Sequence, residues 1–154
     1  MRGGHTVLRI QLICTGRLKE PFFLQACEEY EKRLRRYCTL ECIELPETGD
    51  VEKDGEAMLR RIGSDTWVIA LCVEGRLRSS EELAGMLSDC ANSGRSRICV
   101  LIGGSDGLSP RVKARADEQL SMSRMTFPHH LARVMVLEQL YRAFNINEGG
   151  KYHK

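Results

Sequence analysis

Three glycines that directly follow an apolar run form the part of this sequence best suited to bind a ligand. Residues 98–102 are of strand-forming types and lead straight into residues 103–107, GGSDG. Ser109 then caps a helix that has Pro110 at its first position. Because glycine has no Cβ, backbone N–H groups in this turn could approach a ligand closely.

The glycine turn matches neither of the two common nucleotide-binding motifs. A Walker A loop needs Lys and then Ser or Thr after its last glycine, where this sequence has Leu108 and Ser109. The first two glycines are adjacent, so the G-x-G-x-x-G fingerprint is missing, which disfavours a nicotinamide-dependent oxidoreductase. A tight strand-to-helix turn without any ligand is the alternative interpretation.

The last predicted helix, residues 129–146, carries a charge pair on a nearly all-apolar surface. Glu138 and Arg142 lie one turn apart, in the favourable acid-first order. The pair is either an intrahelical ion pair buried by a partner subunit or a pair held at a functional site. A helix that is apolar nearly all round needs cover on two sides, which predicts a homodimer through this helix.

The chain ends in EGGKYHK, where two glycines precede basic, aromatic and titratable side chains. We expect residues 148–154 to form a flexible tail. Most such tails are disordered, but an aromatic ring beside basic groups is also what nucleotide binding uses.

Apolar periodicity predicts strands and helices in strict alternation. The expected strands are residues 6–15, 39–45, 67–73, 98–102 and 121–127; the expected helices start at Pro21, Ala57, Ser79, Pro110 and His129. This order predicts a single-domain α/β fold with a mostly parallel sheet and helices on both faces. Ligands bind beyond the carboxyl ends of such strands, so residues 71–75, 103–107 and 122–128 should share one pocket.

Length and composition agree with one domain over residues 1–154, of which 1–5 look like a leader. Apolar residues make up 42% and charged residues 29%, as in ordinary soluble proteins. No run approaches the roughly 18 apolar residues of a membrane span, and no secretory signal is present. We therefore expect a cytoplasmic protein with no membrane partner.

Cysteine and charge patterns add two further expectations. The seven cysteines are odd in number and fall largely on apolar positions, which indicates buried free thiols. Cys38 and Cys42 have no second pair and no nearby His, so we predict no metal site. The net charge of +2 does not by itself indicate a nucleic-acid partner, and the basic clusters are either solvated helix faces or an RNA-facing surface.

Three separated motifs carry a resemblance to a known family. LIGGSDGLS, SMSRMTFPHHLARVMVLEQLYRAF and the terminal YHK resemble the RlmH family, ribosomal RNA large-subunit methyltransferase H of the SPOUT superfamily, from about Thr6 to Lys154. The resemblance implies a SPOUT-type fold with a C-terminal trefoil knot. It also implies a homodimer that transfers methyl from S-adenosylmethionine to N3 of pseudouridine 1915, in helix 69 of 23S rRNA in the assembled ribosome.

The resemblance also implies roles for particular residues. The cofactor is expected to contact Leu71, Gly103, Gly104, Met122, Ser123, Arg124, Met125, Thr126 and Phe127. Transfer to N3 requires removal of one proton, for which His129, His153, Glu138 and Tyr152 are all candidates. We expect Glu138 to orient Arg142, and Tyr152 and His153 of the catalytic tail, from the same or the other subunit, to receive the base. The alternative function is a non-catalytic ribosome-binding or RNA-binding module.

Overall fold

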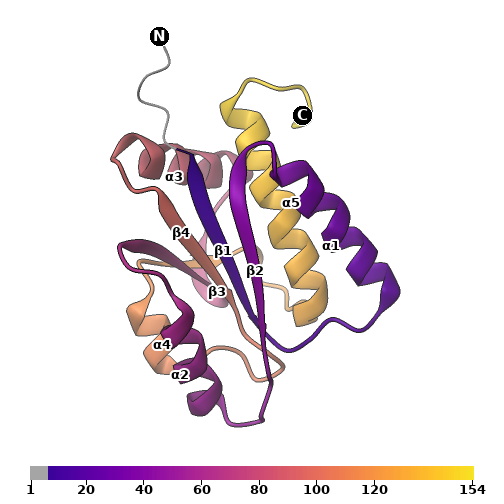
Figure 1. Ribbon diagram of the computed structural model, residues 1–154, viewed down its shortest axis with the longest axis vertical. Helices are drawn as coiled ribbons and strands as arrows, with labels where there is room; N and C mark the ends of the chain where they lie inside the picture. Colours follow the sequence, from indigo (N-terminus) through magenta and orange to yellow (C-terminus); the bar gives the residue numbers. More distant parts are fainter. Residues whose placement is uncertain (1–6) are drawn as a thin grey trace.

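Strands and helices alternate five times along residues 7–154, the part of the chain that the computed structural model describes (Figure 1). The elements are β1 (Leu8–Thr15), α1 (Pro21–Leu34), β2 (Cys38–Leu45), α2 (Val51–Arg61), β3 (Thr66–Leu77), α3 (Ser80–Asn92), β4 (Arg97–Ile102), α4 (Pro110–Arg115), β5 (Glu118–Ser121) and α5 (His129–Asn147). The predicted leader, residues 1–5, lies outside the described residues.

The five described strands form one parallel sheet in the order β2-β1-β4-β3-β5, which confirms the predicted fold class. Successive residues of β4 point to opposite faces: Ile98 and Val100 join one apolar cluster, and Cys99 and Leu101 join the other. Because β4 is covered on both faces, its sequence is apolar throughout and shows no alternation.

Helices cover both faces of the sheet, as the sequence predicted. Figure 1 shows α1 beside α5 on one side of the sheet and α2 beside α4 on the other. The first cluster joins β1, β3 and β4 to α1, α3 and α5, and the second joins them to α2 and α4. None of the helices in residues 7–154 has the length and apolar character that crossing a membrane requires.

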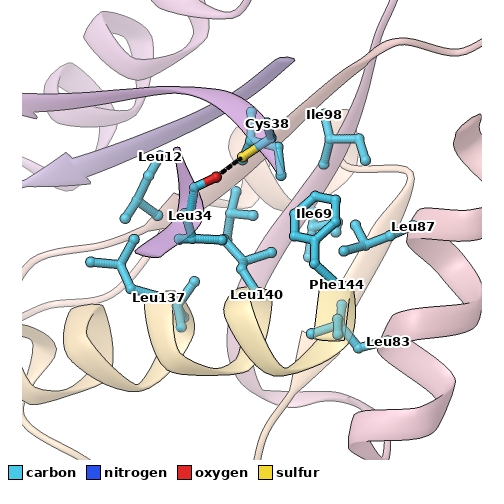
Figure 2. Close-up of a cluster of buried hydrophobic side chains, with 14 of the residues drawn as sticks. Leu12, Leu34, Cys38, Ile69, Leu83, Leu87, Ile98, Leu137, Leu140 and Phe144 are labelled. Atoms are coloured by element: carbon cyan, nitrogen blue, oxygen red, sulfur yellow. Dashed lines mark hydrogen bonds between the residues drawn. The ribbon is translucent and has the colours of Figure 1, made fainter. Parts of the chain in front are cut away.

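Helix α5 is covered on two sides within a single chain. Leu137 and Leu140 are fully buried against the sheet beside Leu34 of α1, and Leu83 of α3 lies near Phe144 in the same cluster (Figure 2). Burying a leucine side chain stabilises the fold by about 1.5–3 kcal/mol. Helices α1 and α3 thus cover much of the apolar surface of α5. That surface therefore does not by itself indicate a homodimer.

Two element boundaries predicted from the sequence are wrong. Helix α2 begins at Val51 and not at Ala57, because the Asp50 side chain accepts from the backbone N–H groups of Glu52 and Lys53 and caps it. The last strand covers Glu118–Ser121 in place of residues 121–127, because α4 before it ends at Arg115. Residues 122–128 are consequently a loop.

The third correction concerns β3, which continues through Glu74 and Gly75 to Leu77. Its pairing with β5 shifts register between Leu71 and Arg76, so residues 72–75 bulge out of the ladder. Gly75 lies so close to β5 that a Cβ there would be 2.6 Å from the carbonyl oxygen of Gln119.

The close approach at Gly75 predicts a sharp difference between two glycine substitutions. Gly75→Ala should destabilise the fold by about 1–3 kcal/mol, because the β5 backbone cannot move without breaking the ladder. Gly85, in α3, has nothing within 4 Å of a built Cβ, so Gly85→Ala should stabilise by about 0.5–1 kcal/mol. Urea unfolding of both variants is the measurement, and equal midpoints would contradict the packing described here.

Candidate functional site

The loops that follow β3, β4 and β5 converge on one cavity of about 630 Å³. Its walls come from Leu71 and the β3 bulge after it, the glycine turn after β4, and the loop at residues 122–128. This convergence confirms the shared pocket predicted from the three strand ends. Helix α5 contributes only His129 and Ala132, at its first turn.

The glycine turn is closed so tightly that side chains would not fit in it. A Cβ at Gly103 would lie 2.5 Å from the carbonyl carbon of Gly107. The N–H of Gly107 donates to the carbonyl oxygen of Gly104 at 3.0 Å, and Gly107 has φ +79°, a conformation that favours glycine. The turn therefore presents bare main chain to the cavity.

The loop at residues 122–128 is tied to its surroundings by polar contacts. The Ser121 hydroxyl donates to the carbonyl of Ser123 at 2.9 Å, and the N–H of Met125 donates to the Ser123 hydroxyl at 3.0 Å. The Arg124 guanidinium donates to the carbonyl of Val73, which joins this loop to the β3 bulge.

Two walls of the pocket also carry charged and polar side chains that the sequence did not single out. Lys113 of α4 forms an ion pair with Glu74 of the bulge, and both line the cavity. Cys72 lines it too, and burial raises the pKa of its thiol, which keeps it protonated. A lysine one turn into the helix after a glycine turn was the available signal for Lys113. Cys72 and Glu74 lie within residues 71–75, which the sequence placed at the pocket, but it gave their side chains no role there.

Four of the five predicted catalytic residues form a second cluster, further along α5. Arg142 donates to both oxygens of Glu138, at 3.2 and 2.8 Å, and the Tyr152 hydroxyl donates to Glu138 at 2.6 Å. His153 lies between Arg142 and Glu81 of α3, with each contact at 3.0 Å. The tail expected to be flexible is thus folded back on α5 and α3, while His129 alone lines the pocket.

Hydrogen bonds in this tail cluster shift the pKa values of two candidate acids and bases in opposite directions. Burial alone would raise the pKa of Glu138, but hydrogen bonds from Arg142 and Tyr152 lower it below its usual value. The hydrogen bond to the Glu138 carboxylate, together with burial, raises the pKa of Tyr152 well above its usual range. Glu138 therefore stays ionised, Tyr152 stays protonated, and neither is suited to accept a proton near pH 7.

At the pocket, burial and the neighbouring His130 lower the pKa of His129. Its imidazole is consequently neutral near pH 7 and has a free capacity to accept a proton. Its Nε2 atom lies 4.0 Å from Glu47, a loop residue that the sequence analysis did not single out.

A second cavity of about 350 Å³ shares one lining residue with the pocket and one with the tail cluster. It lies between β3, α3 and α5, with a mostly apolar floor and Arg78, Ser80, Glu138 and Gln139 among its polar groups. Met122 lines this cavity as well as the pocket at the strand ends. Glu138 thus faces a hollow that adjoins the pocket, although it does not line the pocket itself.

The fold is an α/β fold with a pocket at the carboxyl edge of its parallel sheet, which is where such folds bind ligands. A family model described as "Predicted SPOUT methyltransferase" matches residues 8–153. The chain therefore belongs to the SPOUT methyltransferase family.

Individual relatives agree with this assignment. A protein of Clostridioides difficile (strain 630) named "Ribosomal RNA large subunit methyltransferase H" is 45% identical over 159 residues, which cover 96% of this chain and 100% of the relative. A protein of the same name from Bacillus pumilus (strain SAFR-032) matches with the same identity and coverage. These matches confirm the resemblance seen in the motifs.

A solved structure shows the same fold at low identity. The "Probable Methyltransferase from Bordetella pertussis Tohama I" superposes with a TM-score of 0.58 at 12% identity, over 89% of this chain and 95% of the other. The trefoil knot implied by the resemblance stays a prediction.

The raised pKa of Tyr152 predicts a pH dependence of stability. A tyrosine whose folded-state pKa lies above its ordinary value of 10.0 contributes stability that is present below pH 10 and is lost as the pH rises further. In a spectrophotometric titration, Tyr152→Phe should have one fewer tyrosine than the wild type that ionises only well above pH 10. The variant should also lose less stability than the wild type above pH 10. Identical titration curves above pH 10 would contradict the Tyr152 contact with Glu138.

Proposed function

We propose that this protein is an S-adenosylmethionine-dependent methyltransferase that acts on N3 of a pseudouridine in 23S rRNA, within the assembled ribosome. The observation that supports this most directly is the identity of 45%, over nearly the whole chain, to relatives named ribosomal RNA large subunit methyltransferase H. The pocket supports it independently, since it lies where α/β proteins bind nucleotides. This activity would place the protein with ribosomes in the cytoplasm.

The pocket fits S-adenosylmethionine in size and in chemistry. Its volume of about 630 Å³ lies within the range of roughly 300–1,000 Å³ usual for ligand pockets. Leu71, Ile102, Leu108 and Phe127 offer apolar surface for an adenine ring. Main-chain groups of the glycine turn and of residues 122–127 offer hydrogen bonds to polar atoms, as the resemblance implies for Gly103, Gly104 and this loop.

S-adenosylmethionine supplies a methyl group on a sulfonium, which needs no further activation as a leaving group. The protein must therefore orient the base and remove the N3 proton. Arg142, held by Glu138, would stabilise the negative charge left on the pyrimidine ring. Tyr152, whose one hydroxyl hydrogen is donated to Glu138, would receive the base with its ring and its hydroxyl oxygen. His129 is left as the proton acceptor, because the Nδ1 atom of His153 already accepts from Arg142.

The tail cluster lies too far from the pocket of its own chain to act there directly. Arg142 is ten residues beyond Ala132, the last α5 residue that lines the pocket, which is about 15 Å along the helix. Reacting atoms must approach to about 3–3.5 Å. We infer that a second copy of the chain brings its tail to the pocket, which gives the predicted homodimer a function.

The proposed activity is tested with ribosomes from cells that lack this protein. Incubation with the purified protein and S-adenosylmethionine should add one methyl group to a pseudouridine of 23S rRNA, detected by mass spectrometry of rRNA fragments. The isolated rRNA hairpin should react far more slowly, because a small positive charge gives weak binding to free RNA. An unmodified rRNA together with no heat of cofactor binding would favour the non-catalytic binding module.

Assembly of the site from two chains is tested by mixing two inactive variants. His153→Ala removes a tail residue, and Thr126→Trp fills the pocket from an exposed loop position. The mixture should recover roughly a quarter of the wild-type rate, because half of its dimers are mixed and each mixed dimer has one complete site of two. A mixture as inactive as the separate variants, or a monomeric mass, would contradict this arrangement.

A further inference from the structure

The carboxylate of Glu47 lies where the ends of three strands meet the first turn of α5. Glu47 belongs to the connection between β2 and α2 and does not line the pocket. Its Oε2 atom accepts from the backbone N–H of Ser105 at 2.8 Å and from the Ser105 hydroxyl at 2.9 Å. Its Oε1 atom lies 4.0 Å from His129. One side chain thus contacts two segments that line the pocket.

Gly104 leaves the space that this carboxylate fills, and Gly16 lies beside it. A Cβ at Gly104 would lie 2.6 Å from Cδ and Oε2 of Glu47, so any other residue there would displace the carboxylate. A Cβ at Gly16, just after β1, would lie 3.5 Å from Oε1, and Gly16 has φ +103°. Gly104 is therefore needed for the contact with Glu47 as well as for an open pocket wall.

The contact between Glu47 and Ser105 is charge-assisted. The hydrogen bonds from the Ser105 backbone and hydroxyl lower the pKa of Glu47, so its carboxylate is ionised near pH 7. Hydrogen bonds to an ionised acceptor are roughly twice as strong as neutral ones. A turn with three glycines loses much conformational freedom when it becomes ordered, so a strong external contact has a large effect on its shape.

We propose that Glu47 is a positioning residue that holds the glycine turn, residues 103–107, in the conformation that binds the methyl donor. It acts through Ser105, whose N–H and hydroxyl both point to Glu47. Because the turn is already ordered before the ligand arrives, binding does not have to order it and loses no affinity to that step. Glu47 thus raises cofactor affinity without contacting the cofactor. This proposal rests on the proposed cofactor site.

The experiment is calorimetry of wild type and variants with two ligands, S-adenosylmethionine and S-adenosylhomocysteine, which lacks the sulfonium charge. Glu47→Ala should weaken both ligands about tenfold and to the same extent, because two hydrogen bonds to a charged group are lost. Glu47→Gln should fall between Glu47→Ala and wild type, because an amide oxygen can still accept both bonds but carries no charge. Ser105→Ala, which keeps the backbone bond to the carboxylate, should also fall between Glu47→Ala and wild type. Glu52→Ala, which removes an exposed carboxylate of the same region, is the matched control and should have no effect.

Amide hydrogen exchange gives a readout that does not depend on ligand binding. In Glu47→Ala the Ser105 amide should exchange faster while the amides of β4 keep wild-type rates, which separates a loosened turn from general destabilisation. Wild-type affinity in Glu47→Ala would overturn the proposal. A loss of affinity for S-adenosylmethionine alone would also overturn it, because that would show that Glu47 attracts the sulfonium charge and does not position the turn. If wild type binds neither ligand, the proposed function fails. The role of Glu47 is tested separately, and an unchanged exchange rate of the Ser105 amide in Glu47→Ala would reject it.

Discussion

The burial of β4 on both faces is the constraint on which the rest of the site depends. Residues 98–102 are apolar on both sides of the sheet, so the chain can expose polar groups only after Ile102. The turn that follows Ile102 does so at once. Its backbone is so tightly closed that a Cβ at Gly103 would lie 2.5–2.6 Å from backbone atoms of Gly107. Because β3 and β5 are parallel to β4, their carboxyl ends open at the same edge and complete the pocket.

The walls of the pocket are held by contacts with one another or with segments outside the pocket. Arg124 joins the loop at residues 122–128 to the β3 bulge, and Glu47 joins the glycine turn to the connection after β2. The first turn of α5 forms the remaining wall, and the buried leucines of the same helix fix its position on the sheet. The pocket is thus formed by loops, but its shape is set by the sheet and α5.

Patterns local in sequence predicted much of this arrangement. The apolar run of β4, the glycines after it and the helix start at Ser79 each depend on neighbouring residues, and each is present as predicted. The β3 bulge and the early start of β5 were missed because both arise from pairing between distant segments. Glu47 was missed for the same reason: a single glutamate in a polar connection has no signature, and only the fold brings it to Ser105.

The most direct test of this account is a crystal structure of the protein with S-adenosylhomocysteine. We predict the nucleoside between the β3 bulge, the glycine turn and residues 122–127, with its adenine edge on main-chain groups. We also predict the tail of a second subunit beside it. Ligand bound elsewhere, or this pocket left empty at saturating ligand concentration, would contradict the claim that the three strand ends form a methyl-donor site.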